Sequence, residues 1–365
     1  HTTMQTLGRF AIISGSMLVA LINVVIFSGT ETLNEEQRVA LYADVYVYAL
    51  VIPLVSVLGV FLAKFLSYRT QKAATLEEQD VPASITHERN NTEINWSILL
   101  GSLVFVIFSV GIGVSNIPFS QEIVFIGSLS IIVYLLITLS SQLDAVSKRM
   151  LIGTAVIIFV FRAMPGVGPG ASWFEIDILK FDQEFLSLLG IVASILTIFG
   201  IFVLRPLMEN SSMSRLIIIL SIAGSIFLLP SLGMFYGIHE FTSKLTNGIV
   251  DARFIAIFNT ALESPLGQVS MIPLLAWIAK NAPSHLKATF FAVFASFTNL
   301  ALSASALGTK YLNEIFTVTR EVKDKVSGEI QTSDDYSELG ILLIVVTLLT
   351  LILPILFVFI INNSK

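Results

Sequence analysis

The sequence contains no cysteine and only four histidines in 365 residues. The missing thiols exclude disulfides, thiolate catalysis, cysteine-ligated zinc and iron–sulfur clusters. The histidines are far apart along the chain and show no HExxH spacing, so they predict no compact metal site. They are His1, His87, His239 and His285. We therefore expect neither a metal nor another cofactor.

Charged side chains are also scarce. They make up 13% of the chain, against about 25% in a typical globular protein, whereas apolar residues make up 55%. The net charge, 21 − 26 = −5, provides no broad basic surface for nucleic acid. A chain of this composition cannot cover its apolar residues with polar surface in water. We therefore predict an integral membrane protein whose surroundings are the lipid bilayer.

The motifs of soluble-type catalysis are missing as well. No glycine-rich phosphate loop follows a predicted strand, which leaves an ATP-driven pump unsupported. No pair of catalytic side chains and no set of metal ligands can be recognised. We expect no catalytic residues and no enzyme activity.

Ten apolar stretches are long enough to cross a bilayer as helices, which takes about 20 residues each. Their almost continuous apolar character excludes the alternating pattern of a membrane barrel, and in lipid each backbone polar group needs an internal partner. The sequence therefore predicts an all-α polytopic membrane protein. The predicted spans are 9–29, 46–66, 97–117, 120–143, 150–167, 184–207, 213–236, 252–280, 286–309 and 338–361.

Lysine and arginine in the connections indicate the orientation. With the N-terminus inside, inner segments carry twelve of these residues and outer segments eight, four of them in the loop 310–337. This bias predicts cytoplasmic N- and C-termini, in the inner (plasma) membrane. The opening His1-Thr2-Thr3-Met4 has neither an initiator methionine nor a signal peptide, so we expect native sequence before it.

Two polar connections stand out. Residues 67–95 are charged and predict a solvated cytoplasmic linker between helix groups. Residues 310–337 begin with an amphipathic run that includes Tyr311 and Ile315 and then become charged. This second segment is interpreted either as a short interfacial helix or as a loop that docks a partner.

Two charged residues lie more than two residues from either end of a predicted span, where a charge costs about 2.5–3.5 kcal/mol on insertion scales. Arg162 precedes the breaker run Pro165–Gly170 and could clamp a carboxylate, or extend its stem to the interface. Glu263 lies near the middle of 252–280 and could carry a coupling proton, or hydrogen-bond to neighbouring hydroxyls within the helix packing. Asn259 lies one turn before it, on the same face.

Polar residues and helix breakers surround these charges. Pro265 and Pro273 predict a kinked span of the kind that lines cavities in transporters, although a passive bend is the alternative. Gln268 lies between the two prolines. Asn299 lies among small residues on the next span, where either helix packing or a cavity role is open.

Several motifs together resemble the folate–biopterin transporter family, a branch of the major facilitator superfamily. Leu266-Gly267-Gln268 with Met271-Ile272-Pro273 is similar to the family's LGQ…MP helix, and the stretch from Lys287 to Asn299 is similar to its ATLFAxxxSxxN helix. Weaker similarities lie at Phe316–Arg320, Ala163–Pro165, Met4–Leu7 and Tyr48–Leu54. The chain departs from the family at Asn259, where an Asp is frequent, and at Phe161-Arg162, where the family has Trp-Gln.

The resemblance implies major-facilitator-like helix bundles and a division of the chain. Residues 1–66 would be the last two helices of the N-terminal bundle, and 67–95 the linker. Residues 96–149 would be an inserted transmembrane hairpin at the edge of the bundles. Residues 150–365 would form the C-terminal six-helix bundle.

The function that follows is secondary active transport of a small organic solute, a pterin- or folate-like anion, coupled to protons. Arg162 would meet a substrate carboxylate, Glu263 would carry the proton, and the polar ring would be bound by Asn259, Gln268 and Asn299. The alternative is a non-transporting major-facilitator-like subunit or assembly factor of a larger membrane complex. Its membrane-protein partner would bind through 96–143 or 310–337.

Overall fold

The computed structural model describes residues 2–27, 35–77, 96–115, 117–141, 143–266, 269, 287–324 and 329–363. The chain divides into two compact units, one of residues 1–24 and 108–365 and one of residues 25–107. Helices account for nearly all the regular structure described, which confirms the all-α prediction. The predicted division at 66, 95 and 149 stays a prediction.

The smaller unit, residues 25–107, contains α2 (Glu35–Ala49) and α3 (Val51–Glu77) in full. The two helices meet at a turn in which the Leu50 backbone N–H donates to the carbonyl of Val47 at 3.1 Å. The predicted span 46–66 therefore includes a break near its start. A stretch from Asp44 to Arg69 is apolar enough to cross a membrane.

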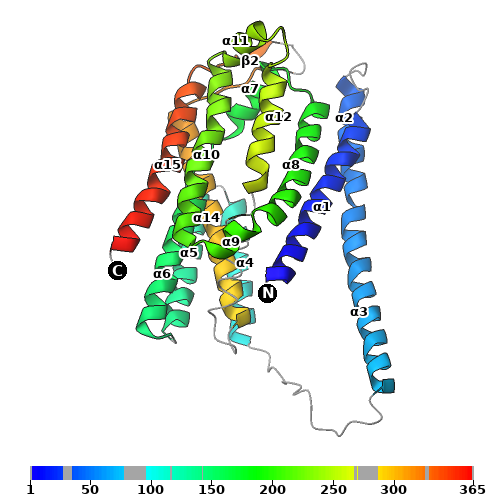
Figure 1. The fold of residues 1–365 in the computed structure, drawn as a ribbon, viewed down its shortest axis with the longest axis vertical. Coiled ribbons are helices and arrows are strands. Elements are labelled where there is room, and N and C mark those ends of the chain that lie inside the picture. Colours follow the sequence, from blue (N-terminus) through cyan, green and yellow to red (C-terminus); the bar gives the residue numbers. More distant parts are fainter. Residues whose placement is uncertain are drawn as a thin grey trace. The chain divides into compact units, whose positions relative to one another are not determined.

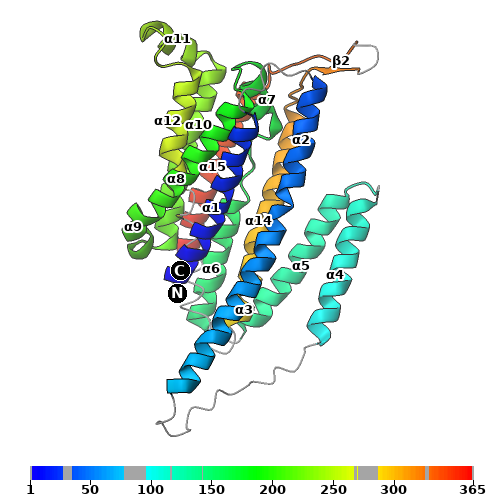
Figure 2. The ribbon, with the colours of Figure 1, turned by 90° about the vertical axis from the view of Figure 1, so that its right-hand side faces the viewer.

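The larger unit holds the remaining elements, and α1 (Thr2–Phe27) and α4 (Trp96–Val114) each belong partly to both units. Figures 1 and 2 show its helices as a bundle. In chain order these are α5 (Ser120–Ser140), α6 (Ala145–Arg162), α7 (Pro169–Asp177), α8 (Gln183–Val203), α9 (Arg205–Asn210), α10 (Met213–Phe235), α11 (Ile238–Leu245), α12 (Ala252–Glu263), the 3₁₀ turn η2 (Ser264–Leu266), α14 (Lys287–Ile315), β1 (Val322–Lys323), β2 (Ile330–Thr332) and α15 (Leu339–Asn363).

Several helices begin at a capping side chain that accepts a backbone N–H three residues later, as an N-cap should. Asp182 caps α8 through the Phe185 N–H at 2.7 Å, and Asp251 caps α12 through the Phe254 N–H at 2.8 Å. Asp144 and Ser212 cap α6 and α10 in the same way. The apolar runs thus begin as helices where a short polar residue satisfies the first free N–H groups.

Seven described helices are long and apolar enough to span a membrane, by length and composition. They cover Phe10–Phe27, Asp44–Arg69, Ser120–Thr138, Gln183–Val203, Met213–Phe235, Phe290–Ile315 and Leu339–Asn363. The other three predicted spans are only partly matched. The predicted span 97–117 is helical in α4 from Trp96 to Val114, of which Phe105–Val114 is the apolar stretch found. α6 carries three cationic residues, and α12 ends at Glu263. Most of 267–286 lies outside the described residues.

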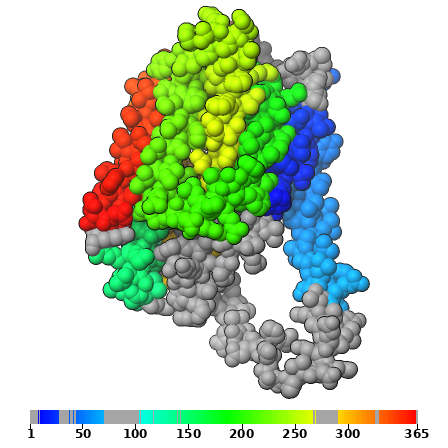
Figure 3. Space-filling view, viewed as in Figure 1, coloured from blue at the N-terminus to red at the C-terminus, as the bar shows by residue number. Residues whose placement is uncertain are grey.

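The core of the larger unit lies between helices that are distant in sequence. α10 packs along α15, α6 packs against α10, α14 and α15, and α5 packs against α14. One buried cluster joins α6 and α14 through Leu151, Ala155 and Ile158 on one side and Phe290, Val293, Phe294 and Phe297 on the other. α12 packs against α8 and α10, and Figure 3 shows these three helices side by side.

The short elements α7 and α11 and the two strands gather at one end of the larger unit (Figures 1 and 2). α14 continues through Ile315 at this end. The interpretation of the run after Lys310 as a separate interfacial helix is therefore wrong. Tyr311 to Ile315 form the last turn of α14, whose N-terminal part, from Phe290 to Phe297, is packed in the core of the larger unit.

Candidate functional site

The break at the end of α12 is the first feature of the candidate site. Pro265 has no backbone N–H and the helix gives way there to the 3₁₀ turn η2. The carbonyl of Ser264 accepts a hydrogen bond from Thr197 Oγ1 of α8 at 2.9 Å. A Cβ on Gly200 would lie 2.4 Å from the Cα and the carbonyl oxygen of Pro265, so only glycine allows α8 to come this close.

Asn259 and Glu263 lie one helical turn apart just before this break. Asn259 is half-buried, and its Oδ1 is shielded from solvent without a hydrogen-bond partner in the described structure. A shielded acceptor without a partner is costly, so the position favours a donor supplied from elsewhere. Glu263 is exposed at the last residue of α12.

Arg162 ends α6 and contacts α14. Its Nε donates a long hydrogen bond of 3.4 Å to the backbone carbonyl of Thr298, whose side chain is buried. The rings of Phe159 and Phe297 pack nearby on the same two helices, with centroids 5.0 Å apart. The guanidinium is half-buried and held beside α14. Asn299 follows Thr298 and is exposed.

Asn299 belongs to a row of exposed small and polar residues on α14. Their spacing of three and four residues places them on one helix face. The row consists of Ala292, Ser296, Asn299, Ser303 and Ala306. Exposed hydroxyl and amide groups on a membrane helix are unfavourable against hydrocarbon, so this face is suited to water, a polar solute or protein.

The breaker run after Arg162 is hydrogen-bonded to the C-terminal half of α14 by three side chains spaced four residues apart. Ser305 Oγ donates to the carbonyl of Met164 at 2.6 Å. Thr309 Oγ1 accepts the Gly166 N–H at 2.8 Å, and Asn313 Nδ2 donates to the carbonyl of Val167 at 3.1 Å. These contacts were not predicted, although Ser305, Thr309 and Asn313 share a helix face and could have signalled a polar attachment.

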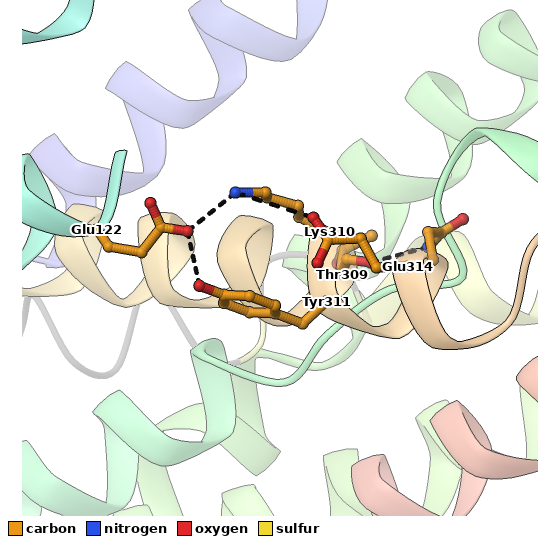
Figure 4. A network of polar contacts seen from close by, with 6 residues as sticks. Glu122, Thr309, Lys310, Tyr311 and Glu314 are labelled. Carbon is orange, nitrogen blue, oxygen red and sulfur yellow. Dashed lines mark hydrogen bonds and ion pairs between the residues drawn. The ribbon is translucent and has the colours of Figure 1, made fainter. Parts of the chain in front are cut away.

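A second unpredicted contact joins α5 to α14 (Figure 4). The carboxylate of Glu122 accepts hydrogen bonds from Lys310 Nζ at 2.9 Å and from the Tyr311 hydroxyl at 2.7 Å. The side chain of Glu122 is 16% exposed and that of Lys310 39%, so solvent still reaches the lysine side of the ion pair. It ties the second helix of the predicted hairpin to α14. A glutamate at a span start and a lysine near a span end were the only signals in the sequence.

The loop after α14 is fastened to α7. We call residues 316–324 and 329–338 the outer strap. Arg320 donates two hydrogen bonds of 2.7 Å to the two carboxylate oxygens of Asp177, and the Tyr336 hydroxyl donates a third at 2.8 Å. The Arg320 hydrogen bond lowers the pKa of Asp177, and burial together with the Asp177 contact raises the pKa of Tyr336 to about 12.

The structure groups the predicted site residues as two pairs. Arg162 and Asn299 lie on α6 and α14, whereas Asn259 and Glu263 lie on α12 beside α8 and α10. Gln268 lies outside the described residues. Within the described parts of the chain, no cluster of three or more histidine, aspartate or glutamate side chains could hold a metal.

Comparison with known proteins identifies the family. A family model described as the BT1 family matches residues 2–365, and a search of curated proteins finds no match. The BT1 family consists of folate–biopterin transporters of the major facilitator type, which move small organic solutes and are not enzymes. The match extends over nearly the whole chain, including the motifs around Gln268 and Asn299. The chain therefore belongs to the BT1 family and is an integral membrane transporter of the major facilitator type.

Proposed function

We propose that this chain transports a pterin- or folate-like anion across the inner (plasma) membrane in a proton-coupled cycle, with both termini cytoplasmic. In this cycle Arg162 meets a carboxylate of the solute, and Asn259, Gln268 and Asn299 hydrogen-bond its polar ring. Glu263 carries the coupling proton. The binding site is the interface between two helix bundles that rock against each other.

The observation that carries the proposal is the exposed polar face of α14, the helix that Arg162 also contacts. Ser296, Asn299 and Ser303 present hydroxyl and amide groups on this face. Arg162 contacts the same helix through the Thr298 carbonyl, one residue before Asn299 and about 100° away around the helix axis. A planar guanidinium and an amide carried by two adjacent helices suit a solute that has both a carboxylate and a ring with donors and acceptors.

The broken end of α12 supports the second half of the proposal. Interrupted helices whose backbone is held by neighbours are a recurrent wall of transporter sites. Asn259 there has a shielded Oδ1 without a partner among the described residues, which a ring N–H could satisfy once the rocking of the bundles exposes it. Glu263, one turn later and exposed, can exchange a proton with water or with solute.

The decisive experiment is uptake into liposomes that contain the purified full chain. We expect labelled folate or biopterin to accumulate when the vesicle interior is more alkaline than the outside, and a protonophore to abolish accumulation. Glu263→Gln should lose the dependence on the pH gradient while retaining exchange of solute between the two sides. Glu184→Gln, an exposed carboxylate in the first turn of α8, is the control and should behave as the native chain.

Two results would contradict the proposal. Gradient-independent uptake by the native chain would refute proton coupling, and native pH dependence in Glu263→Gln would reduce Glu263 to a packing residue. Arg162→Lys tests the solute contact separately, because lysine keeps the charge but loses the bidentate geometry. We expect it to raise KM for folate more than it lowers the maximal rate.

A specific contact favours the alternative function enough to test it in the same material. The Glu122–Lys310 ion pair joins one residue from each of the two segments proposed to bind a membrane partner, 96–143 and 310–337. A non-transporting subunit would stay in a stoichiometric complex when native membranes are dissolved in mild detergent, and would show no solute uptake. A lone monomer with uptake would exclude it.

A further inference from the structure

The helix α11 lies between α10 and α12, at the end of the larger unit where α7 and the strands also lie (Figures 1 and 2). It has no buried residue. Its large apolar side chains are strongly exposed, with Phe241 at 66% and Leu245 at 73%. The flanking Tyr236 and Ile249 are exposed as well.

The exposed apolar residues of α11 share one face. At 100° per residue, Phe241 and Leu245 lie within about 60° of Ile238 around the helix axis. Glu240, Ser243 and Lys244 lie between about 140° and 240° from it, on the opposite face. Thr242 falls on the apolar side, but its hydroxyl is satisfied because it donates to the Val250 carbonyl at 2.8 Å. The helix is therefore sharply two-sided.

The position of α11 along the chain places it at the boundary of the membrane. α10 has 23 residues and is about 34 Å long, which matches a hydrocarbon core of about 30 Å. α10 ends at Phe235, and Gly237, with φ of 79°, turns the chain into α11 immediately afterwards. An α-helix that begins three residues after a span ends starts within the interfacial layer.

The apolar face of α11 is directed back along α10. The side chain of Ile238 lies against Gly233, where an added Cβ would meet Ile238 Cδ1 at 3.0 Å. Gly233 is in the last turns of the span, so the face that carries Ile238 is turned toward the membrane side. The turn after α11 holds this orientation, because Thr246 Oγ1 donates to the Thr242 carbonyl and accepts the Val250 N–H.

From these observations we infer that α11 is an interfacial anchor, whose Ile238, Phe241 and Leu245 insert into the acyl–headgroup boundary of the lipid bilayer while Glu240 and Lys244 face water. A short amphipathic helix lies in this plane when its apolar face is buried in lipid and its polar face is solvated. The anchor would fix the end of α10 and the start of α12, and so the depth of Asn259 and Glu263 in the membrane.

The absence of cysteine makes a direct test simple, since single cysteines need no background removal. Phe241→Cys and Leu245→Cys, with Glu240→Cys and Lys244→Cys as matched controls, are labelled with a nitroxide in the full chain. The proteins are placed in phosphatidylethanolamine–phosphatidylglycerol vesicles. Collisions with oxygen, which concentrates in lipid, are compared with collisions with a water-soluble nickel chelate. We expect oxygen to dominate at 241 and 245, and nickel at 240 and 244.

Two outcomes overturn the inference. Equal nickel access at all four positions would place α11 in water, and exclusion of both reagents at 241 and 245 would mean that protein, such as a second copy, covers the face. If a cysteine variant fails to fold, Phe241→Trp and Lys244→Trp replace it, with quenching by brominated lipid as the readout. Quenching at 241 that is no stronger than at 244 would also refute lipid insertion.

Discussion

The contact between Asp177 and the outer strap gives a prediction that can be worked out from the structure. Asp177→Asn removes the negative charge that receives three hydrogen bonds, two from Arg320 and one from Tyr336. The asparagine has similar volume, so the effect is electrostatic rather than steric. We expect the outer strap to open more often from α7 in this variant.

The size of the effect follows from the exposure of the pair. Hydrogen bonds to a charged group are worth about 1.5–3 kcal/mol each when shielded, whereas exposed ion pairs contribute about 0.2–1 kcal/mol. The side chains of Arg320 and Asp177 are 43% and 27% exposed, so solvent screens the interaction. We expect a total loss of about 1–2 kcal/mol, which raises the open fraction of the strap about 5- to 30-fold.

Amide hydrogen exchange measured by mass spectrometry reads this fraction directly. The backbone N–H groups of Thr319 and Asp335 bond to each other's carbonyls at 3.0 Å and should exchange faster in Asp177→Asn. Asp334→Asn, an exposed aspartate of the same strap, is the control and should leave exchange unchanged. Native exchange rates in Asp177→Asn would refute the reasoning.

The pH dependence has a definite sign. The pKa of Asp177 is lowered in the folded chain, mainly by the Arg320 hydrogen bond. The stabilisation is therefore complete above the ordinary aspartate pKa of about 3.9 and is lost as the pH falls through the lower folded value. After correction for the intrinsic exchange rate, the native strap should lose protection in acid. Asp177→Asn should not show this loss, and a variant that still showed it would assign the titration to another group.

Two further predictions concern contacts between helices. Gly200→Ala should lower stability in detergent by about 1–3 kcal/mol, measured as thermal unfolding, because the added Cβ would lie 2.4 Å from the Pro265 backbone. Gly190→Ala is the control, because an added Cβ there has no neighbouring atom closer than 3.9 Å. Glu122→Gln and Lys310→Met should each lower the unfolding midpoint, and the double variant should lose less than the sum, because the two side chains form one ion pair. Additive losses would show that the pair is not formed in the membrane.

The helices could be predicted because the membrane leaves little choice of secondary structure. An apolar run such as 213–236 has no water for its backbone, so it forms the helix Met213–Phe235 and begins after the capping hydroxyl of Ser212. The boundary errors occur where local polar chemistry matters. The span predicted at 46–66 includes the turn at Leu50. Pro53 signals this turn, because it has no N–H for the carbonyl of Ala49, but the prediction of one continuous span did not use it.

The contacts between helices could not be predicted. Glu122 and Lys310 are 188 residues apart, and periodicity within a helix identifies a face but not the helix that will cover it. The same limit applies to the candidate site. The break at Pro265 followed from the proline itself, whereas the support of Ser264 by Thr197 depends on how α8 and α12 pack.

Some serine and threonine side chains of this chain donate hydrogen bonds to backbone carbonyls at helix breaks, a role beyond close packing. Each backbone group that a break leaves without its helical partner needs a substitute in lipid. In the larger unit such substitutes come from other helices. Thr197 serves the carbonyl of Ser264, and Ser305 serves that of Met164. Ser305 lies six residues beyond Asn299 on α14. The helix that carries Asn299, a proposed solute ligand, is therefore also hydrogen-bonded to the non-helical segment after Arg162. A shift of α14 would move Asn299 and this segment together.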